Sequence, residues 1–92
     1  MTGTLTDNVA RSRFEMQLEG CTAFIDYRRS GNTLYLDHAE VPAALGGHGV
    51  GTRMVRATLE LLRERGERAV PVCSFVQAFV RRHPEFAESG SP

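Results

Sequence analysis

The sequence contains no lysine: all eleven of its basic residues are arginine, and eleven aspartates and glutamates balance them to a formal net charge of zero. A neutral chain produces no long-range field that would attract nucleic acid or an anionic membrane surface, so neither partner is expected. An all-arginine composition fits a GC-rich bacterial genome, and the planar arginine fork also suits phosphate recognition. Composition alone does not separate these two explanations.

Long apolar runs and a leader pattern are also missing. No stretch approaches the length of a membrane span, and the N-terminus lacks the charged-then-apolar order of a signal peptide. We therefore expect a cytoplasmic protein. The two cysteines, Cys21 and Cys73, are expected to be free thiols in such a reducing compartment. No metal site is expected.

Ninety-two residues with a hydrophobic fraction of 41% are enough for one small domain with a single core. The first ten residues are small and polar, and the last six read AESGSP. We expect residues 1–10 and 87–92 to be flexible ends that flank one domain over 11–86.

Alternating apolar and polar residues predict three strands before the middle of the chain. From Arg13 the apolar positions Phe14, Met16 and Leu18 alternate with polar ones, and residues 21–28 continue after a glycine. The turn-forming residues 29–32 then lead into a third strand over 33–41, which a proline ends. Its alternation would place four side chains on one face: Leu34, Leu36, His38 and Glu40.

A helix, a strand and a second helix are predicted beyond this meander. Apolar residues at three- and four-residue spacing indicate a helix from about Val50 to Arg65. AVPVC, over 69–73, fits a short buried strand. Residues 74–83 fit a helix in which Ser74 and Gln77 have the spacing of a capping box. The order predicts an α+β fold with an α/β-like part: an antiparallel meander, a β–α–β crossover and a C-terminal helix.

Four of the nine glycines fall within six residues, in LGGHGVGT, between the third strand and the long helix. The crossover would place this loop at the carboxyl end of a strand, where helix N–H groups form an anion site. A Walker A loop is excluded because the chain has no lysine. A Rossmann fingerprint is excluded because Gly47, Gly49 and Gly51 are separated by single residues.

The loop resembles the pyrophosphate-binding motif of the GNAT superfamily of acetyl-CoA-dependent N-acetyltransferases. Gly49 and Gly51 occupy its two small positions, whereas Gly46 stands where glutamine or arginine is usual. The flanking segments LDHAEVP and VPVCSFVQAFVRRHPEF are similar to those of a branch of short, single-domain GNAT-like proteins. The resemblance extends from about Phe14 to Phe86. It implies a truncated GNAT fold that lacks the usual N-terminal helices and last strands, and it implies acetyl-CoA or CoA as cofactor.

The resemblance also assigns candidate residues. The cofactor-binding set is Val41, Gly47, His48, Gly49, Val50, Gly51, Thr52 and Ser74. The catalytic candidates are Glu40 or His38 as the base and Cys73 as a proton donor or acetyl acceptor. Each has a structural alternative: the glycines could serve close packing, Glu40 could be a rim carboxylate, His38 a core group, and Cys73 a buried small hydrophobe.

The expected function is transfer of acetyl from acetyl-CoA to a primary amine, on a small molecule or a protein lysine. The third strand would separate from the last near Val41 and leave a slot for pantetheine. The alternative is a non-catalytic CoA-binding or interaction module, because the missing N-terminal helices normally help to form the acceptor site. The acceptor, and whether the protein is a monomer or a homodimer, stay open at this point.

Overall fold

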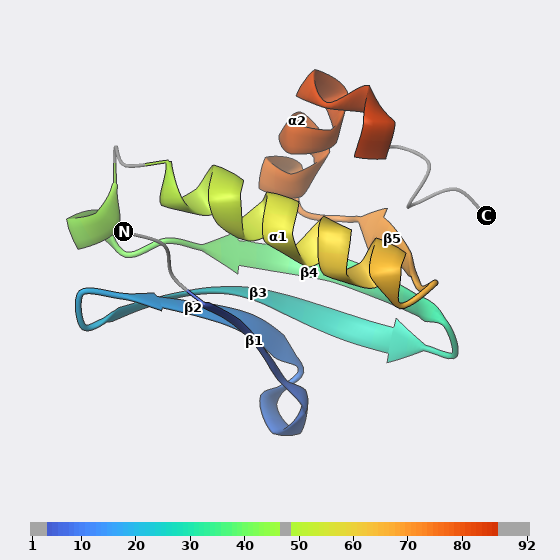
Figure 1. The fold of residues 1–92 in the computed structure, drawn as a ribbon, viewed down its shortest axis with the longest axis horizontal. Helices are drawn as coiled ribbons and strands as arrows, with labels where there is room; N and C mark the ends of the chain where they lie inside the picture. The colour runs from blue at the N-terminus through green and yellow to red at the C-terminus, as the bar shows by residue number, and fades with distance from the viewer. Residues whose placement is uncertain (1–3, 47–48, 87–92) are drawn as a thin grey trace.

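The computed structural model describes residues 4–46 and 49–86. Within these ranges the chain forms one five-stranded sheet in the order β1-β2-β3-β4-β5 and two α-helices. Both helices lie on the same side of the sheet (Figure 1). The elements are β1 (Thr4–Asn8), β2 (Arg13–Leu18), β3 (Cys21–Ser30), β4 (Thr33–Glu40), α1 (Val50–Glu64), β5 (Arg68–Pro71) and α2 (Ser74–Arg82).

The first four strands pair antiparallel with their sequence neighbours, and β5 pairs parallel with β4 after the α1 crossover. This confirms the predicted α+β class, with a meander followed by a β–α–β unit. Two short 3-10 turns, Val9–Arg11 and Ala43–Leu45, connect β1 to β2 and β4 to α1. No helix in the described ranges is long and apolar enough to span a bilayer.

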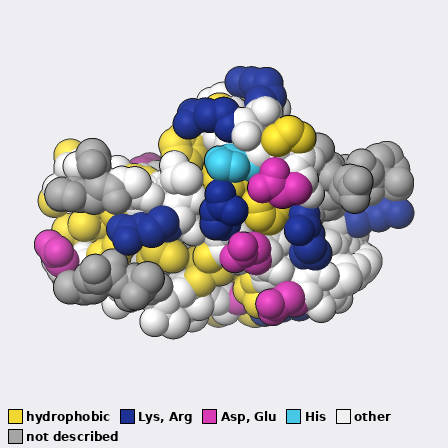
Figure 2. Space-filling view, turned by 45° about the horizontal axis from the view of Figure 1, so that its top comes forward, with side chains coloured by type: hydrophobic (Ala, Val, Ile, Leu, Met, Phe, Trp, Pro, Cys, Tyr) yellow, Lys and Arg dark blue, Asp and Glu magenta, His cyan; other side chains and the backbone are white. Residues whose placement is uncertain are grey.

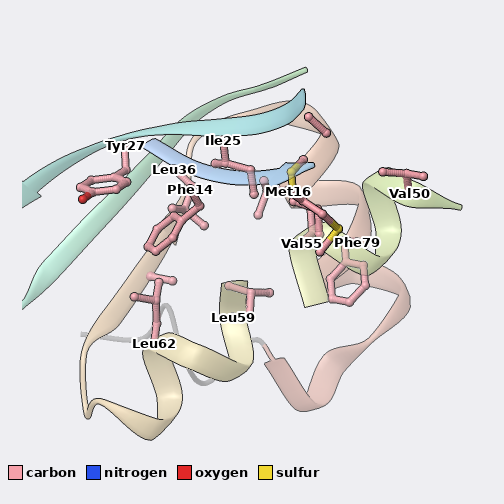
Figure 3. Close-up of a cluster of buried hydrophobic side chains, with 14 of the residues drawn as sticks. Phe14, Met16, Ile25, Tyr27, Leu36, Val50, Val55, Leu59, Leu62 and Phe79 are labelled. Carbon is pink, nitrogen blue, oxygen red and sulfur yellow. The ribbon is translucent and has the colours of Figure 1, made fainter. Parts of the chain in front are cut away.

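The core lies between the sheet and the helices (Figure 3). The alternating residues of β2 and the helical stripe of α1 meet there, as the two hydrophobic periods predicted. Burying each large apolar side chain contributes about 1.5–3 kcal/mol relative to leaving it exposed. The largest fully buried side chains are Phe14, Ile25, Leu34, Leu36, Met54, Leu59, Leu62, Val55, Val76 and Thr58.

One strand was not predicted. Residues 4–8, expected to belong to a flexible N-terminus, form β1 and pair along β2. Leu5 lies opposite Met16 and packs against the core, and Asp7 accepts a hydrogen bond of 2.7 Å from the Tyr27 hydroxyl. The prediction failed because this segment carries a single large apolar residue, whereas its stability depends on partners distant in sequence. The predicted flexible tail, 87–92, lies outside the described residues.

A β-bulge in β4 overturns one predicted face. Tyr27 pairs with Leu36 while Asp26 pairs with His38, so Asp37 is an extra residue on β4. Because a one-residue shift moves every following side chain to the other face, Ala39 turns toward the core and His38 and Glu40 turn away from it. The prediction that these two share a face with Leu34 and Leu36 is therefore wrong. We call the side of the sheet without helices the outer face.

The start of α2 also differs from the prediction. Cys73 is the N-cap residue, with extended backbone angles and no side-chain cap, and Ser74 is the first helical residue. The Gln77 side chain donates to the carbonyl oxygens of Pro71 and Val72, at 3.0 and 3.3 Å, and not to a capping partner. Ser74 is therefore not the N-cap residue, and the predicted capping box of Ser74 and Gln77 is wrong.

Candidate functional site

β4 and β5 separate toward one end of the sheet. Their parallel ladder runs from Thr33–Arg68 to Leu36–Pro71, whereas β4 continues to Glu40. The Leu36 carbonyl accepts the last hydrogen bonds, from the backbone N–H groups of Val72 at 3.1 Å and Cys73 at 2.9 Å. The separation thus begins after Leu36, earlier than the predicted Val41. Among the described residues, β4 beyond this point has a strand partner only on its β3 side.

The N-terminus of α1 lies at the same end of the sheet as this divergence. Gly49 is its N-cap, in the left-handed conformation with φ 69° and ψ 18°, and neither a side-chain cap nor an acidic residue in the first turn is present. The first backbone N–H groups of a helix have no intrahelical acceptor, and the helix dipole adds a partial positive charge there. This end of α1 can therefore bind an anion. Gly47 and His48 lie outside the described residues.

Gly51 has a packing role as well. A Cβ atom at this buried position would lie 2.7 Å from Cζ of Phe75 and 3.2 Å from Cγ2 of Val41. Three elements, the end of β4, the first turn of α1 and the first turn of α2, thus meet where there is no room for a methyl group. The close-packing alternative holds for Gly51. Gly49, by contrast, is the N-cap residue and adopts the left-handed conformation, which favours glycine.

Two exposed apolar side chains flank Cys73 at the divergence. Val72 is 45% exposed and Phe75 is 41% exposed. Both side chains are therefore available for contact with the apolar part of a ligand. Sequence reasoning missed Phe75; the available signal was an aromatic residue one position after the Cys73–Ser74 pair.

His38 and Glu40 form a pair on the outer face. His38 Nε2 lies 3.1 Å from Glu40 Oε1, and the two side chains are 57% and 61% exposed. The His38 ring also lies 6.2 Å from the ring of Phe24, on the neighbouring strand. The interpretation of His38 as a core group is wrong, and the reason is the bulge. The pair can accept a proton from a group that approaches from the outer face.

The bulge itself carries an ion pair. Arg28 donates two hydrogen bonds to Asp37, of 2.6 and 2.9 Å. These hydrogen bonds and the positive charge of Arg28 lower the pKa of the Asp37 carboxyl. The same hydrogen bonds and the negative charge of Asp37 raise the pKa of Arg28. The extra residue of β4, which has no partner in the β3–β4 ladder, is thus held to β3 by its side chain.

Cys73 occupies a different environment. It is half-buried, packs partly against the core, and is a free thiol like Cys21, as predicted. Within the part of the chain that the structure describes, no hydrogen bond or ion pair joins its side chain to His38 or Glu40. The structure therefore brings two of the three catalytic candidates together and leaves the third on its own. Ser74 is exposed at the first position of α2.

The fold and this arrangement define an acyltransferase class. A family model described as GCN5-related N-acetyl-transferase matches residues 13–89. The chain therefore belongs to the GCN5-related N-acetyltransferase family, in agreement with the resemblance and the enzyme class predicted from the sequence.

Individual relatives agree with this assignment. Protein NATD1 of Bos taurus is 34% identical over 77 residues, which cover 80% of this chain and 68% of that protein. Protein NATD1 of Xenopus tropicalis is 31% identical over the same share of this chain and 71% of its own length. The solution structure of a GCN5-like protein from Staphylococcus aureus matches with a TM-score of 0.70 at 26% identity, covering 94% of this chain and 85% of that one. Because these relatives come from animals and a bacterium, the expected bacterial origin stays a prediction.

Proposed function

We propose that the chain binds acetyl-CoA at the divergence of β4 and β5 and transfers the acetyl group to a primary amine. The observation that supports this most is the meeting of three features at one place. These are the edge of β4 beyond Leu36, which has no partner there among the described strands, the N-terminus of α1 without a side-chain cap, and the apolar contact of Phe75 with Gly51.

The first turn of α1 would hold the pyrophosphate. The backbone N–H groups of Val50, Gly51 and Thr52 have no acceptor within the helix, and the dipole favours an anion there. The Val50 side chain is buried, so only its main chain would take part. Gly47 and His48 are expected to complete the cradle.

The edge of β4 would pair with the pantetheine arm. Amide groups of the arm can take the hydrogen-bonding positions that a neighbouring strand would fill, from Asp37 to Val41. Val72 and Phe75 would form the apolar wall of the slot, since both are exposed beside it. A backbone N–H at this edge would then polarise the thioester carbonyl and stabilise the negative charge that develops on its oxygen.

The His38–Glu40 pair would act as the base. Because both side chains face away from the helices, the acceptor amine would approach from the outer face. Its proton would pass to Glu40, or to His38 beside it, as the nitrogen attacks the carbonyl carbon. The carbon–sulfur bond then breaks, and the departing thiolate takes up a proton.

Cys73 has two candidate roles. It could give that proton to the leaving thiolate, or its sulfur could first take the acetyl group with release of CoA and then pass it to the amine. The routes differ in an intermediate. A mass increase of one acetyl group after acetyl-CoA is added without an amine, lost in Cys73→Ala but kept in Cys21→Ala, supports the covalent route. Its absence under single-turnover conditions leaves direct transfer.

A non-catalytic CoA-binding module is the second candidate. The observation that favours it is that neither described helix covers the outer face around Glu40, where an acceptor would have to bind. The same cofactor slot would then serve recognition without turnover.

Thiol release in the presence of amines separates the two candidates. The protein is mixed with acetyl-CoA and with an alkyl amine, a polyamine or a lysine peptide, and free CoA thiol is measured. Release that depends on one of the amines supports acetyl transfer. CoA binding without release across the panel supports the module, and no binding at millimolar CoA contradicts both.

A further inference from the structure

A hollow lies away from the proposed cofactor site, between α1 and β1. Its lining residues are Leu5, Ala57, Glu60, Leu61 and Glu64, and its volume is about 240 Å³. We call it the α1–β1 groove. Its floor is apolar, because Leu5, Ala57 and Leu61 are partly buried and pack against the core. The helix-bearing side of the molecule shows hydrophobic side chains exposed among charged ones of both signs (Figure 2).

The acidic side of the groove is unfavourable for the helix that carries it. Glu60 and Glu64 stand four residues apart on α1, where like charges repel. Glu64 is also the last residue of α1, where the helix dipole favours cations over anions. Both side chains are exposed, and no hydrogen bond or ion pair joins either of them to another described residue. The pair therefore lacks a cation that its position would favour.

The strand that borders the groove has an open edge. β1 is the first strand of the sheet order and pairs only with β2 among the described strands. Its other edge presents backbone N–H and C=O groups without a ladder partner, which is a template for another extended chain. At one end, Arg65 joins α1 to this strand through Asp7, at 3.0 Å, so the distance between helix and strand is fixed there.

We propose that the α1–β1 groove is a docking site for an extended basic peptide segment of a partner protein. The peptide adds a strand to the free edge of β1. Every second side chain of the peptide faces the groove. Among these, the apolar ones lie on Leu5 and Leu61, and the lysines or arginines pair with Glu60 and Glu64. Strand addition supplies affinity through the main chain, while the groove selects side chains by charge and shape. This site is separate from the proposed CoA site and does not depend on it.

The test is an NMR titration of the full chain, labelled with ¹⁵N, with the peptide acetyl-Val-Thr-Lys-Thr-Val-Thr-Lys-amide, in which valine and lysine alternate on one face of the strand. The amides of Thr4–Asn8 and of the last two turns of α1 are expected to shift. A twin peptide with glutamate in place of each lysine is expected not to bind.

The double variant Glu60→Gln/Glu64→Gln should weaken binding at least about threefold, since exposed charge pairs contribute modestly. It removes only exposed like charges, so it is expected to fold. Glu19→Gln, at an exposed carboxylate in the β2–β3 turn, is the matched control and should leave the affinity unchanged.

Four results would overturn the proposal: no shifts at millimolar peptide, shifts confined to other elements, equal binding of the acidic twin, or an affinity that the double variant leaves unchanged. Sedimentation of the free protein tests the other occupant. A dimer that buries β1 would also overturn the proposal, because a second copy of this chain would then cover the groove.

Discussion

The ring of Phe75 lies so close to Gly51 that a Cβ atom added there would come within 2.7 Å of the ring. Val41 closes the same space from the end of β4. This contact sets how near the first turn of α1 comes to the divergence of β4 and β5. It therefore couples the packing of the three elements to the geometry of the proposed pyrophosphate site.

The contact predicts a coupled pair of substitutions. Gly51→Ala should lower the free energy of unfolding by about 1–3 kcal/mol, because an overpacked site forces the ring to move. In a Phe75→Ala background the ring is gone, and the same substitution should cost at least about 1 kcal/mol less, since alanine is otherwise favoured in a helix. Urea unfolding of the four proteins measures this coupling. An equal cost in both backgrounds would show that the ring does not limit the site.

Deleting Asp37 tests the bulge. Without the extra residue, β4 would pair regularly with β3 while His38 and Glu40 still face outward, so the chain is expected to fold. Since a bulge bends its strand, the deletion should straighten β4 toward β5 and weaken CoA binding. Asp37→Asn keeps the bulge and loses only the ion pair with Arg28, so it should bind CoA as the parent does. An unchanged CoA affinity in the deletion variant would contradict the assigned role of the divergence.

Tyr27 gives a pH-dependent prediction. Burial of its phenol, helped by the hydrogen bond to Asp7, raises the pKa to about 12. In the unfolded chain a tyrosine ionises near pH 10. The folded state thus holds the proton more tightly, so this contribution to stability is complete below about pH 10 and is lost as the pH rises toward 12. The phenolate absorbance of a Tyr35→Phe variant, whose one tyrosine is Tyr27, measures the value. Ionisation near pH 10 in the folded protein would refute the assignment.

Glu40 is predicted to affect turnover and not cofactor binding. Glu40→Gln should lower kcat about 10²- to 10⁴-fold, which is the usual contribution of a general base, while the Kd for CoA is unchanged. Glu85→Gln removes an exposed carboxylate elsewhere in the molecule and serves as the control. Full activity of the Glu40→Gln variant would show that another group is the base.

The sequence predicted the parts of the fold that local patterns determine. Phe14, Met16 and Leu18 alternate along β2, and the helical stripe predicted the end of α1 to within one residue of the observed end. β1 was missed because Leu5 is its single large apolar residue, and its pairing depends on β2. No propensity rule signals a non-local contact of that kind.

The sequence indicated candidate site residues but not the orientation of their side chains. The glycine loop and the N-terminus of α1 could be recognised from residue order. The bulge could not, because Asp37 looks like one more polar position in an alternating strand, and only the pairing with β3 shows that it is extra. That single residue decides which face carries His38 and Glu40. The contact of Phe75 with Gly51 likewise joins residues from two helices that periodicity treats separately.

Calorimetry on two glycine variants tests whether the N-terminus of α1 binds the CoA pyrophosphate. Gly49 and Gly66 lie near opposite ends of α1 with nearly equal positive φ angles, 69° and 70°, and a Cβ atom on either would meet open space. Alanine at either position should therefore lower the free energy of unfolding by a similar amount, about 1–2 kcal/mol, because both residues keep a left-handed backbone. Titration with CoA should show binding by the parent and by Gly66→Ala. Gly49→Ala should bind at least about tenfold more weakly, because a shifted backbone misdirects the N–H groups. Equal CoA affinity in both variants, or no binding by the parent at millimolar CoA, would contradict pyrophosphate binding at this end of α1.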